Sequence, residues 1–230
     1  MLKMAADTGT TDIVATPHAD LRFKFDAELV AERIRELAAA TGNVPQIHSG
    51  CDFHFSLENV QAALANPSQF TINGLSYLMV EFADNFIPPS AEDVFREFAI
   101  HGIVPVITHP ERNPILQGSH ELLRKWIQLG CLVQVTAQSL TGRFGKAANR
   151  TAWALLRKSL VHVVASDAHD TEQRPPRLDR ACKILTAEMG AEAASLLLEE
   201  NPAAVIRGER VWIQAAVPSP PKKKWFLFGQ

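Results

Sequence analysis

The feature that most constrains the fold is a regular alternation of short apolar runs with longer amphipathic segments. Runs such as VPVIT (104–108) and VHVVA (161–165) have the length and the β-branched content of buried strands. The segments between such runs, for example 26–42, place apolar residues near helical spacing and end at glycine. Strands that alternate with helices predict an α/β fold with a parallel sheet, and about six such units favour a barrel over a sandwich.

Each expected element has a defined range. The expected strands span 11–18, 44–53, 77–82, 102–113, 131–139 and 161–169, and the expected helices span 26–42, 56–67, 90–102, 120–130, 146–159 and 177–202. Ser56 and Ser90 are the expected N-caps of two helices, and Gly190 should break the last one.

Composition predicts one domain with a short tail. The 230 residues are 47% hydrophobic, which is enough for one core, and we expect a single domain over 1–212. The segment 213–230 combines prolines, three lysines and aromatic residues, and we expect a flexible tail there. With a net charge of −2, a general nucleic-acid surface is not expected. The chain has three separated cysteines and no apolar run of membrane-spanning length, so we expect a cytoplasmic protein whose membrane contact is only indirect.

Polar residues that can bind metal follow almost every expected strand. In a parallel α/β sheet the carboxyl ends of the strands lie at one face, so these residues should converge although they span about 150 positions. Asp167 and His169 are two apart and should point the same way. The candidate ligands are His18, Asp52, Glu81, His109, Asp167 and His169.

The donor set indicates a divalent transition metal. Histidine combined with carboxylates, without cysteine, is typical of Zn²⁺, Mn²⁺ or Fe sites, and several carboxylates could bridge more than one ion. One histidine at a strand end is more often an ordinary hydrogen-bonded loop residue, so the prediction depends on the whole set. Glu81 is the strongest member, because a carboxylate in an apolar strand needs a charged partner. We interpret the remaining histidines, except the ambiguous His54, as surface or capping residues: His48, His101, His120 and His162.

Three arginines fall at the same expected face of the sheet. Arg112 follows the His109 strand end, Arg143 lies in the loop SLTGRFG, and Arg174 lies five residues beyond His169. Arginine binds phosphate or carboxylate through two parallel N–H donors, so metal ions beside arginines suggest hydrolysis of a phosphate ester. A surface salt bridge is the alternative for each arginine taken singly. The pattern Cys-x5-Arg of the cysteine phosphatases is absent, which favours metal chemistry over a thiolate nucleophile.

These motifs, in this order, resemble the bacterial polymerase-and-histidinol-phosphatase (PHP) tyrosine phosphatases of the capsule and exopolysaccharide type. The resemblance rests on ATPH, GCD, VEF, ITHPERN, SLTGRFG and SDAHD through RPP, and it covers about residues 3–210. It implies a distorted (β/α)7 barrel with up to three metal ions, most often manganese, with iron or zinc as alternatives. It also implies hydrolysis of phosphotyrosine on the C-terminal tail of a tyrosine autokinase that controls polysaccharide synthesis.

The resemblance assigns roles to individual residues. His18, Glu81, His109, Asp167 and His169 match metal positions, and Arg112 and Arg174 match phosphate-binding positions, while Arg143 lies in a matching substrate-binding loop. With His169 in addition, these two arginines form the expected catalytic set. The implied partner is a phosphotyrosine protein.

Two departures from the family pattern qualify these expectations. The family has Glu where this chain has Asp52, and it begins with a strand carrying Asp-x-His-x-His, whereas this sequence contains no HxH. We therefore expect a barrel without its first strand, fewer than three metal ions, and possible homo-oligomers through exposed sheet edges. Two alternatives to the tyrosine phosphatase stay open: a phosphatase for a small metabolite of the histidinol-phosphate type, and an inactive protein that only binds its partner.

Overall fold

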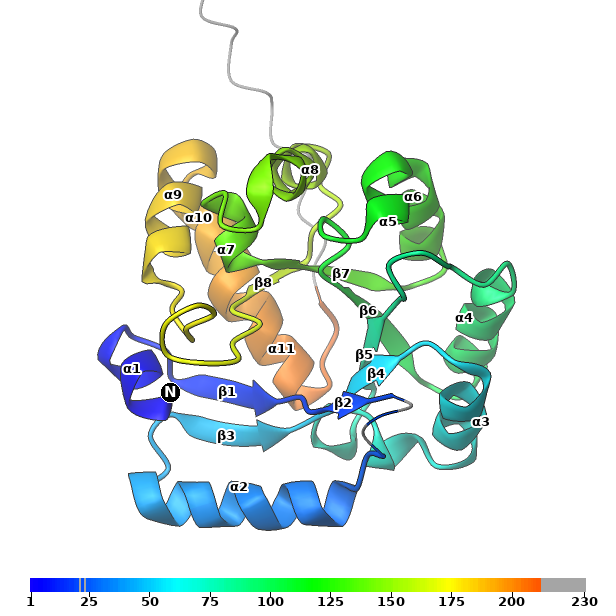
Figure 1. The fold of residues 1–230 in the computed structure, drawn as a ribbon, viewed down its shortest axis with the longest axis horizontal. Coiled ribbons are helices and arrows are strands. Elements are labelled where there is room, and N and C mark those ends of the chain that lie inside the picture. Colours follow the sequence, from blue (N-terminus) through cyan, green and yellow to red (C-terminus); the bar gives the residue numbers. More distant parts are fainter. Residues whose placement is uncertain (21, 23, 212–230) are drawn as a thin grey trace, which may run out of the picture.

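The structure is a computed structural model that describes residues 1–20, 22 and 24–211. All paired strands are parallel, and they form two sheets (Figure 1). The smaller sheet pairs β1 (Asp12–Ala15) with β3 (Gln46–Ser49). The larger sheet has the order β2 (His18–Ala19), β4 (Asp52–His54), β5 (Tyr77–Glu81), β6 (Val104–Thr108), β7 (Leu132–Thr136) and β8 (Val163–Ala165). The predicted parallel α/β architecture is confirmed.

Helices surround this curved sheet, most of them on its outer face, whereas the helix at Asn201–Arg207 packs against its inner face (Figure 1). They are α1 (Leu2–Asp7), α2 (Ala27–Thr41), α3 (Leu57–Ala65), α4 (Ala91–Ile100), α5 (Pro114–Gly118), α6 (His120–Gln128), α7 (Ala137–Leu140), α8 (Gly145–Arg157), α9 (Asp179–Met189), α10 (Ala191–Ser195) and α11 (Asn201–Arg207). A π-helical stretch (Leu196–Glu200) joins α10 to α11, and short 3₁₀ turns lie at Pro67–Gln69 and Ile72–Gly74.

Local sequence signals explain several helix boundaries. The Ser56 hydroxyl accepts from the backbone N–H of Asn59 at 3.2 Å and caps α3 as predicted. Ser90 stands at the N-cap position of α4 but makes no side-chain cap bond. Gly190, at φ 93°, separates α9 from α10 as expected, because a residue with a Cβ rarely adopts this backbone conformation.

Two predicted strands are each divided in two, at a shared interruption. The expected strand 11–18 becomes β1 and β2, and the expected strand 44–53 becomes β3 and β4, and the parallel pairing resumes beyond the break in the same register. Gly50 explains why the chains approach so closely there: a Cβ at this position would lie 2.8 Å from Cγ1 of Val14. The interruption moves His18 and Asp52 to the beginning of the large sheet, opposite each other.

The core has two parts that follow the strand alternation. Leu78, Ile107 and Val133 point outward into the larger cluster between the sheet and the helices. Tyr77, Val106, Leu132 and Val163 point inward, into a second cluster that also contains Val211. Polar residues continue the inward-facing rows toward the carboxyl ends of the strands, so the apolar cluster forms a floor beneath them.

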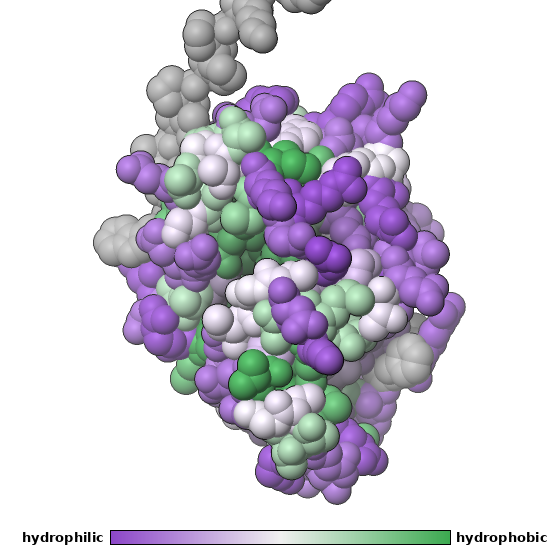
Figure 2. Space-filling model, turned by 90° about the vertical axis from the view of Figure 1, so that its left-hand side faces the viewer, coloured by the Kyte–Doolittle hydropathy of each residue, from purple (hydrophilic) through white to green (hydrophobic). Residues whose placement is uncertain are grey.

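The remaining expectations about organisation have different outcomes. No helix in the described part of the chain is long and apolar enough to cross a membrane. On the face that Figure 2 shows, hydrophilic side chains interrupt the apolar areas. All of the predicted tail, 213–230, lies outside the described residues, as does 212 at the end of the predicted domain. Within the described ranges β2 and β8 are the two edges of the large sheet, and the expectation of a missing strand stays a prediction.

Candidate metal centre and arginine pair

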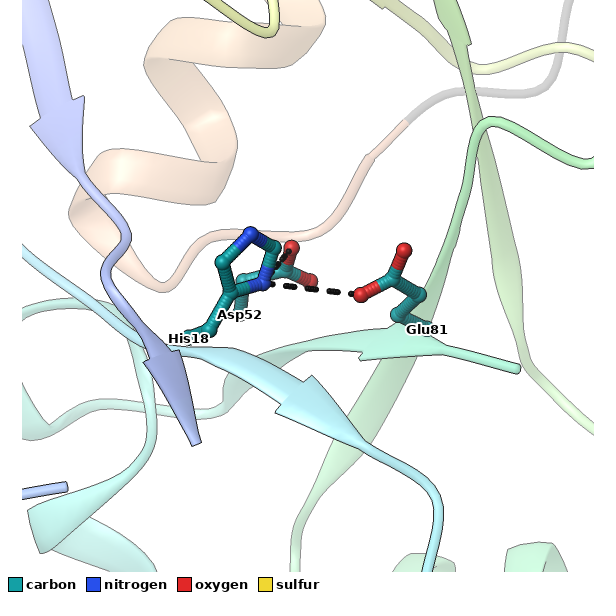
Figure 3. A group of neighbouring side chains, drawn as sticks. All are labelled: His18, Asp52 and Glu81. Atoms are coloured by element: carbon teal, nitrogen blue, oxygen red, sulfur yellow. Dashed lines mark ion pairs between the residues drawn. The ribbon is translucent and has the colours of Figure 1, made fainter. Parts of the chain in front are cut away.

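Three predicted ligands meet on neighbouring strands, His18 and Asp52 at the first positions of β2 and β4, and Glu81 at the last position of β5 (Figure 3). Nδ1 of His18 lies 3.0 Å from Oδ2 of Asp52 and 3.5 Å from Oε2 of Glu81. One potential ligand atom from each of the three residues lies within 4.8 Å of the others. Backbone pairing sets this arrangement, because His18 is the register partner of Asp52.

Two further histidines extend this cluster. Nε2 of His109, at the end of β6, lies 3.4 Å from Oε1 of Glu81, so the Glu81 carboxylate stands between two imidazoles. The rings of His18 and His169 have centroids 6.0 Å apart. Nδ1 of His169 lies 3.1 Å from the backbone oxygen of Asp167, so donation there leaves Nε2 for the site.

The residues present fit a divalent cation. Two ligands about 2.1 Å from a shared ion can be about 4 Å apart, close to the spacing in this cluster. Oδ1 of Asp52 is buried without a hydrogen-bond partner among the described residues, which is costly for a carboxylate unless a cation satisfies it. Imidazole nitrogens and carboxylate oxygens are the donors that manganese, iron and zinc accept.

The electrostatics show acidic and basic groups forced into close contact. The hydrogen bond to Asp52 raises the pKa of His18 to about 8. Burial, together with the neighbouring charge of Asp52, raises the pKa of Glu81 to about 7. Burial and the nearby Arg112 guanidinium lower the pKa of His109 and favour its neutral form. A neutral imidazole beside a carboxylate is the protonation state that metal binding requires.

Asp167 connects the histidine cluster to the arginines. Its Oδ2 accepts short hydrogen bonds from both Arg112 and Arg174, and its Oδ1 lies 3.9 Å from Nδ1 of His169. Asp167 has φ 49° and His109 has φ 34°, conformations that are uncommon for residues other than glycine. Strained residues of this kind concentrate at functional sites, which supports a special role for both strand ends.

Arg143 has different contacts from the other two arginines. Its Nε donates to the backbone oxygen of Gln173 at 2.7 Å, and its Nη2 donates to the Gln173 side chain at 2.8 Å and to the backbone oxygen of Glu172 at 3.3 Å. The structure thus brings Arg112 and Arg174 together at Asp167, whereas Arg143 fastens its own loop to the segment that carries Arg174.

Sequence reasoning did not single out two residues that organise the arginines. The Phe144 ring lies beneath both guanidinium groups, with Arg112 Cζ 4.4 Å and Arg174 Cζ 5.8 Å from its centroid. Oδ1 of Asp170 accepts from the backbone N–H groups of Glu172, Gln173 and Arg174, so it shapes the loop. The glycines around Phe144 and the Asp at the start of a turn are weak signals that become meaningful only in three dimensions.

Glu111 is a buried residue beside the site that hydrogen-bonds to the neighbouring segment. It is fully buried, and its Oε1 accepts from the Ser139 hydroxyl at 2.6 Å and from the Thr136 backbone N–H at 3.1 Å. Burial raises its pKa to about 7. Glu111 therefore ties the loop that carries His109 and Arg112 to the beginning of α7.

The other histidines lie outside the cluster, as predicted, but one of them is not a surface residue. His48 pairs with Asp12 in the small sheet, with Nε2 and Oδ1 2.8 Å apart. His162 is 1% exposed, and its Nδ1 accepts from the Val133 backbone N–H, so its interpretation as a surface or capping residue is wrong. The residue faces the interior because the strand pairing of β8 extends back to it.

The chain is similar in sequence to a known family and to known proteins. A family model described as "Capsular polysaccharide synthesis, CpsB/CapC" matches residues 1–207. Tyrosine-protein phosphatase YwqE of Bacillus subtilis (strain 168) is 31% identical over 233 residues, which cover 100% of this chain and 90% of YwqE. Putative tyrosine-protein phosphatase CapC of Staphylococcus aureus is 32% identical over 238 residues, which cover 98% of this chain and 89% of CapC.

A solved structure shows the same fold. It comes from work on YwqE from Bacillus subtilis and CpsB from Streptococcus pneumoniae, described as unique metal-dependent tyrosine phosphatases. The TM-score is 0.86 with 31% sequence identity, and the match covers 97% of this chain and 90% of the other. The similarity thus includes nearly all of the sheet and its site.

Proposed function

This chain belongs to the CpsB/CapC family of capsular polysaccharide synthesis, and we propose on that premise that it is a metal-dependent protein-tyrosine phosphatase. Its substrate is a phosphotyrosine protein whose phosphorylation regulates capsule or exopolysaccharide synthesis. The observation that carries the proposal is the contact of a His/carboxylate cluster with an arginine pair through one residue, Asp167. A metal-dependent phosphomonoesterase uses a metal site and phosphate-binding cations side by side.

The metal ligands in this proposal are the six predicted residues. His18, Asp52 and Glu81 would hold one ion, and Glu81 can contribute its second oxygen toward His109. Asp167 and His169 complete the set from the end of β8. When bound, divalent ions lower the pKa of water and neutralise phosphate charge. Manganese is the ion that we propose, with iron or zinc as alternatives.

Arg112 and Arg174 are the proposed phosphate-binding residues. Both donate to the same Asp167 oxygen, so their N–H groups already converge on one anionic atom. Phosphate oxygens offer the same bidentate geometry as a carboxylate, and each arginine keeps further donors for them. The pair would orient the phosphoryl group so that an attacking oxygen lies opposite the tyrosyl leaving oxygen, and would stabilise the negative charge of the phosphoryl oxygens.

His169 is the third residue of the proposed catalytic set. Donation from Nδ1 to the Asp167 backbone oxygen orients the ring, as hydrogen bonds to backbone carbonyls orient many ligating histidines. Nε2 would then act as a ligand, or hold the proton that the leaving oxygen receives. Arg143, by contrast, has a proposed positioning role, because its donors hold the 172–173 backbone.

The three thiols supply no alternative nucleophile. Cys51 and Cys131 are buried, and burial raises the pKa of both thiols, which keeps them protonated. Cys182 lies half-buried in α9, away from the strand ends that carry the site. Attack on phosphorus therefore does not proceed through cysteine. The cognate autokinase tail, the cytoplasmic location and the oligomeric state stay predictions.

The test is phosphate release from a phosphotyrosine peptide and from histidinol phosphate, with metal content measured on the same preparation. We expect turnover of the peptide that depends on bound divalent metal and strong preference over the metabolite. Preference for histidinol phosphate would replace this function with the small-metabolite alternative. Metal-loaded protein that binds the peptide without releasing phosphate would identify a binding protein instead.

A further inference from the structure

The two phosphate-binding arginines share one aromatic platform, Phe144. Both guanidinium carbons lie within about 6 Å of the ring centroid, the range in which a cation is attracted to an aromatic face. The two arginines come from different loops, after β6 and after β8. Phe144 is thus a single side chain that contacts both halves of the proposed phosphate site.

Phe144 and Asp167 contact different parts of the two guanidinium groups. Asp167 accepts from one N–H group of each arginine, and arginine N–H groups are also the donors that bind phosphate. An aromatic ring covers the flat face of a guanidinium and leaves its N–H edge and its charge available. Phe144 can therefore keep two like-charged, flexible side chains ordered while both bind substrate, at low cost in rotamer entropy.

Two glycine turns and several hydrogen bonds fix the conformation of the loop around Phe144. Gly142 and Gly145 adopt φ 81° and φ 89°, which permits a sharp change of direction on both sides of the ring. On one side Arg143 binds the 172–173 backbone. On the other, the Asn149 amide donates to the backbone oxygens of Ser139 and Leu140 at 2.8 and 2.9 Å.

From these contacts we propose that Phe144 is a positioning residue that preorders Arg112 and Arg174 for phosphate binding. The inference rests on the proposed function, and it concerns the strength of phosphate binding more than the chemical step. Loss of the ring should therefore raise the dissociation constant for inorganic phosphate and the KM for phosphotyrosine, with a smaller effect on kcat.

The experiment compares Phe144→Leu, Phe144→Tyr and the wild type as full-length, manganese-loaded proteins. Isothermal titration with inorganic phosphate should show binding about 5- to 30-fold weaker for Phe144→Leu, while Phe144→Tyr stays within about 2-fold of the wild type. Arg157→Ala is the matched control, because it removes an arginine–aromatic contact away from the site: Arg157, at the end of α8, has Cζ 5.7 Å from the centroid of the Trp153 ring. Phe144→Met provides the same test if the leucine variant does not fold.

A second comparison separates action through the arginines from direct contact with the substrate. In an Arg174→Ala background, Phe144→Leu should weaken phosphate binding by a clearly smaller factor than in the wild type. An equal factor in both backgrounds, or unchanged phosphate binding in folded Phe144→Leu, overturns the inference while leaving the phosphatase proposal intact. Weaker phosphate binding in a protein that turns over no phosphotyrosine supports the positioning role and refutes the phosphatase proposal.

Discussion

Asp52 illustrates how a single strand residue becomes a candidate ligand. It is 8% exposed, one oxygen contacts His18, and the other lacks a partner among the described residues. A buried carboxylate in this condition lowers stability unless a cation completes its coordination. The residue therefore makes sense energetically as part of a metal site, although the family pattern places the longer Glu at this position.

Replacing Asp52 by Asn tests this role directly. The change keeps the shape of the side chain but removes the charge, so we expect metal content to fall and kcat/KM to drop by at least about 100-fold. Elemental analysis and phosphotyrosine turnover provide the measurements. Asp12→Asn is the matched control, because Asp12 also pairs with a histidine but belongs to the small sheet. Similar metal loss in both variants would contradict the assignment.

His162 predicts how stability changes with pH. Burial lowers its pKa to about 4, whereas an unfolded histidine titrates near 6.5. The unfolded state binds the proton first, so the free energy of unfolding should decrease as the pH falls from about 6.5 to 4, by at most about 3 kcal/mol. Glu111, whose pKa is raised to about 7, acts in the opposite direction over part of this range.

The contribution of His162 is therefore measured as a difference. Denaturant unfolding of the wild type and of His162→Asn at pH 7.5 and pH 5 should show a smaller decrease for the variant. The Asn side chain can still accept from the Val133 N–H group, so the local hydrogen bond need not be lost. Equal decreases in the two proteins would show that His162 does not titrate across this range.

At the scale of elements, the loop after β8 carries most of the proposed chemistry. Asp167, His169 and Arg174 follow one another within it, and three backbone N–H groups converge on the Asp170 carboxylate. These bonds lower the pKa of Asp170 and close a turn that directs Arg174 back toward Asp167. The conformation of one loop thus determines where a phosphate-binding group lies.

Asp170→Ala should reduce activity without unfolding the protein. Losing the acceptor would let Arg174 move, and displacement of a positioning group can reduce kcat/KM by up to about 100-fold. Asp170→Asn retains an oxygen acceptor and should be affected much less. Thermal unfolding of both variants should stay close to that of the wild type, because Asp170 is only partly buried and lies in a loop. A large decrease in stability would instead indicate a structural role for the whole loop.

At the scale of the whole molecule, the large sheet separates two apolar clusters. The smaller cluster lies beneath the site, and the larger cluster packs the sheet against the helices on its outer face. The His/carboxylate cluster and the two arginines beside it come from five strands or from the loops that follow them. A bound ion would therefore connect parts of the chain that are far apart in sequence. The stability of the fold should therefore depend on metal.

Manganese should raise the free energy of unfolding of metal-free protein by about 2.7 kcal/mol at a concentration 100-fold above its dissociation constant. Thermal unfolding with and without the ion measures this shift. A chelator should abolish turnover, whereas iodoacetamide should leave it unchanged, because Cys51 and Cys131 are buried and Cys182 lies on α9, away from the strand ends that carry the site. Activity that survives chelation but not alkylation would refute the metal mechanism.

The sequence by itself determined the fold class and indicated which polar residues should lie close together. Strand-length apolar runs ending in His, Asp or Glu suffice for this, because parallel strands place their carboxyl ends at one face whatever the lengths of the helices between them. The interruption of the two N-terminal strands was not predictable, because it depends on the approach of Gly50 to Val14.

Only the tertiary structure decided how the arginines divide their roles and which residues orient them. Sequence places Arg112, Arg143 and Arg174 at one face of the sheet, but it does not show that two of them converge on Asp167 and that the third holds a neighbouring backbone. Phe144 gains its position from contacts between loops about 30 residues apart. The local sequence shows the hydrophobic periodicity and the side-chain chemistry of each helix and strand. Contacts between loops form only when the strands assemble, because they depend on distances that the order of elements along the chain does not specify.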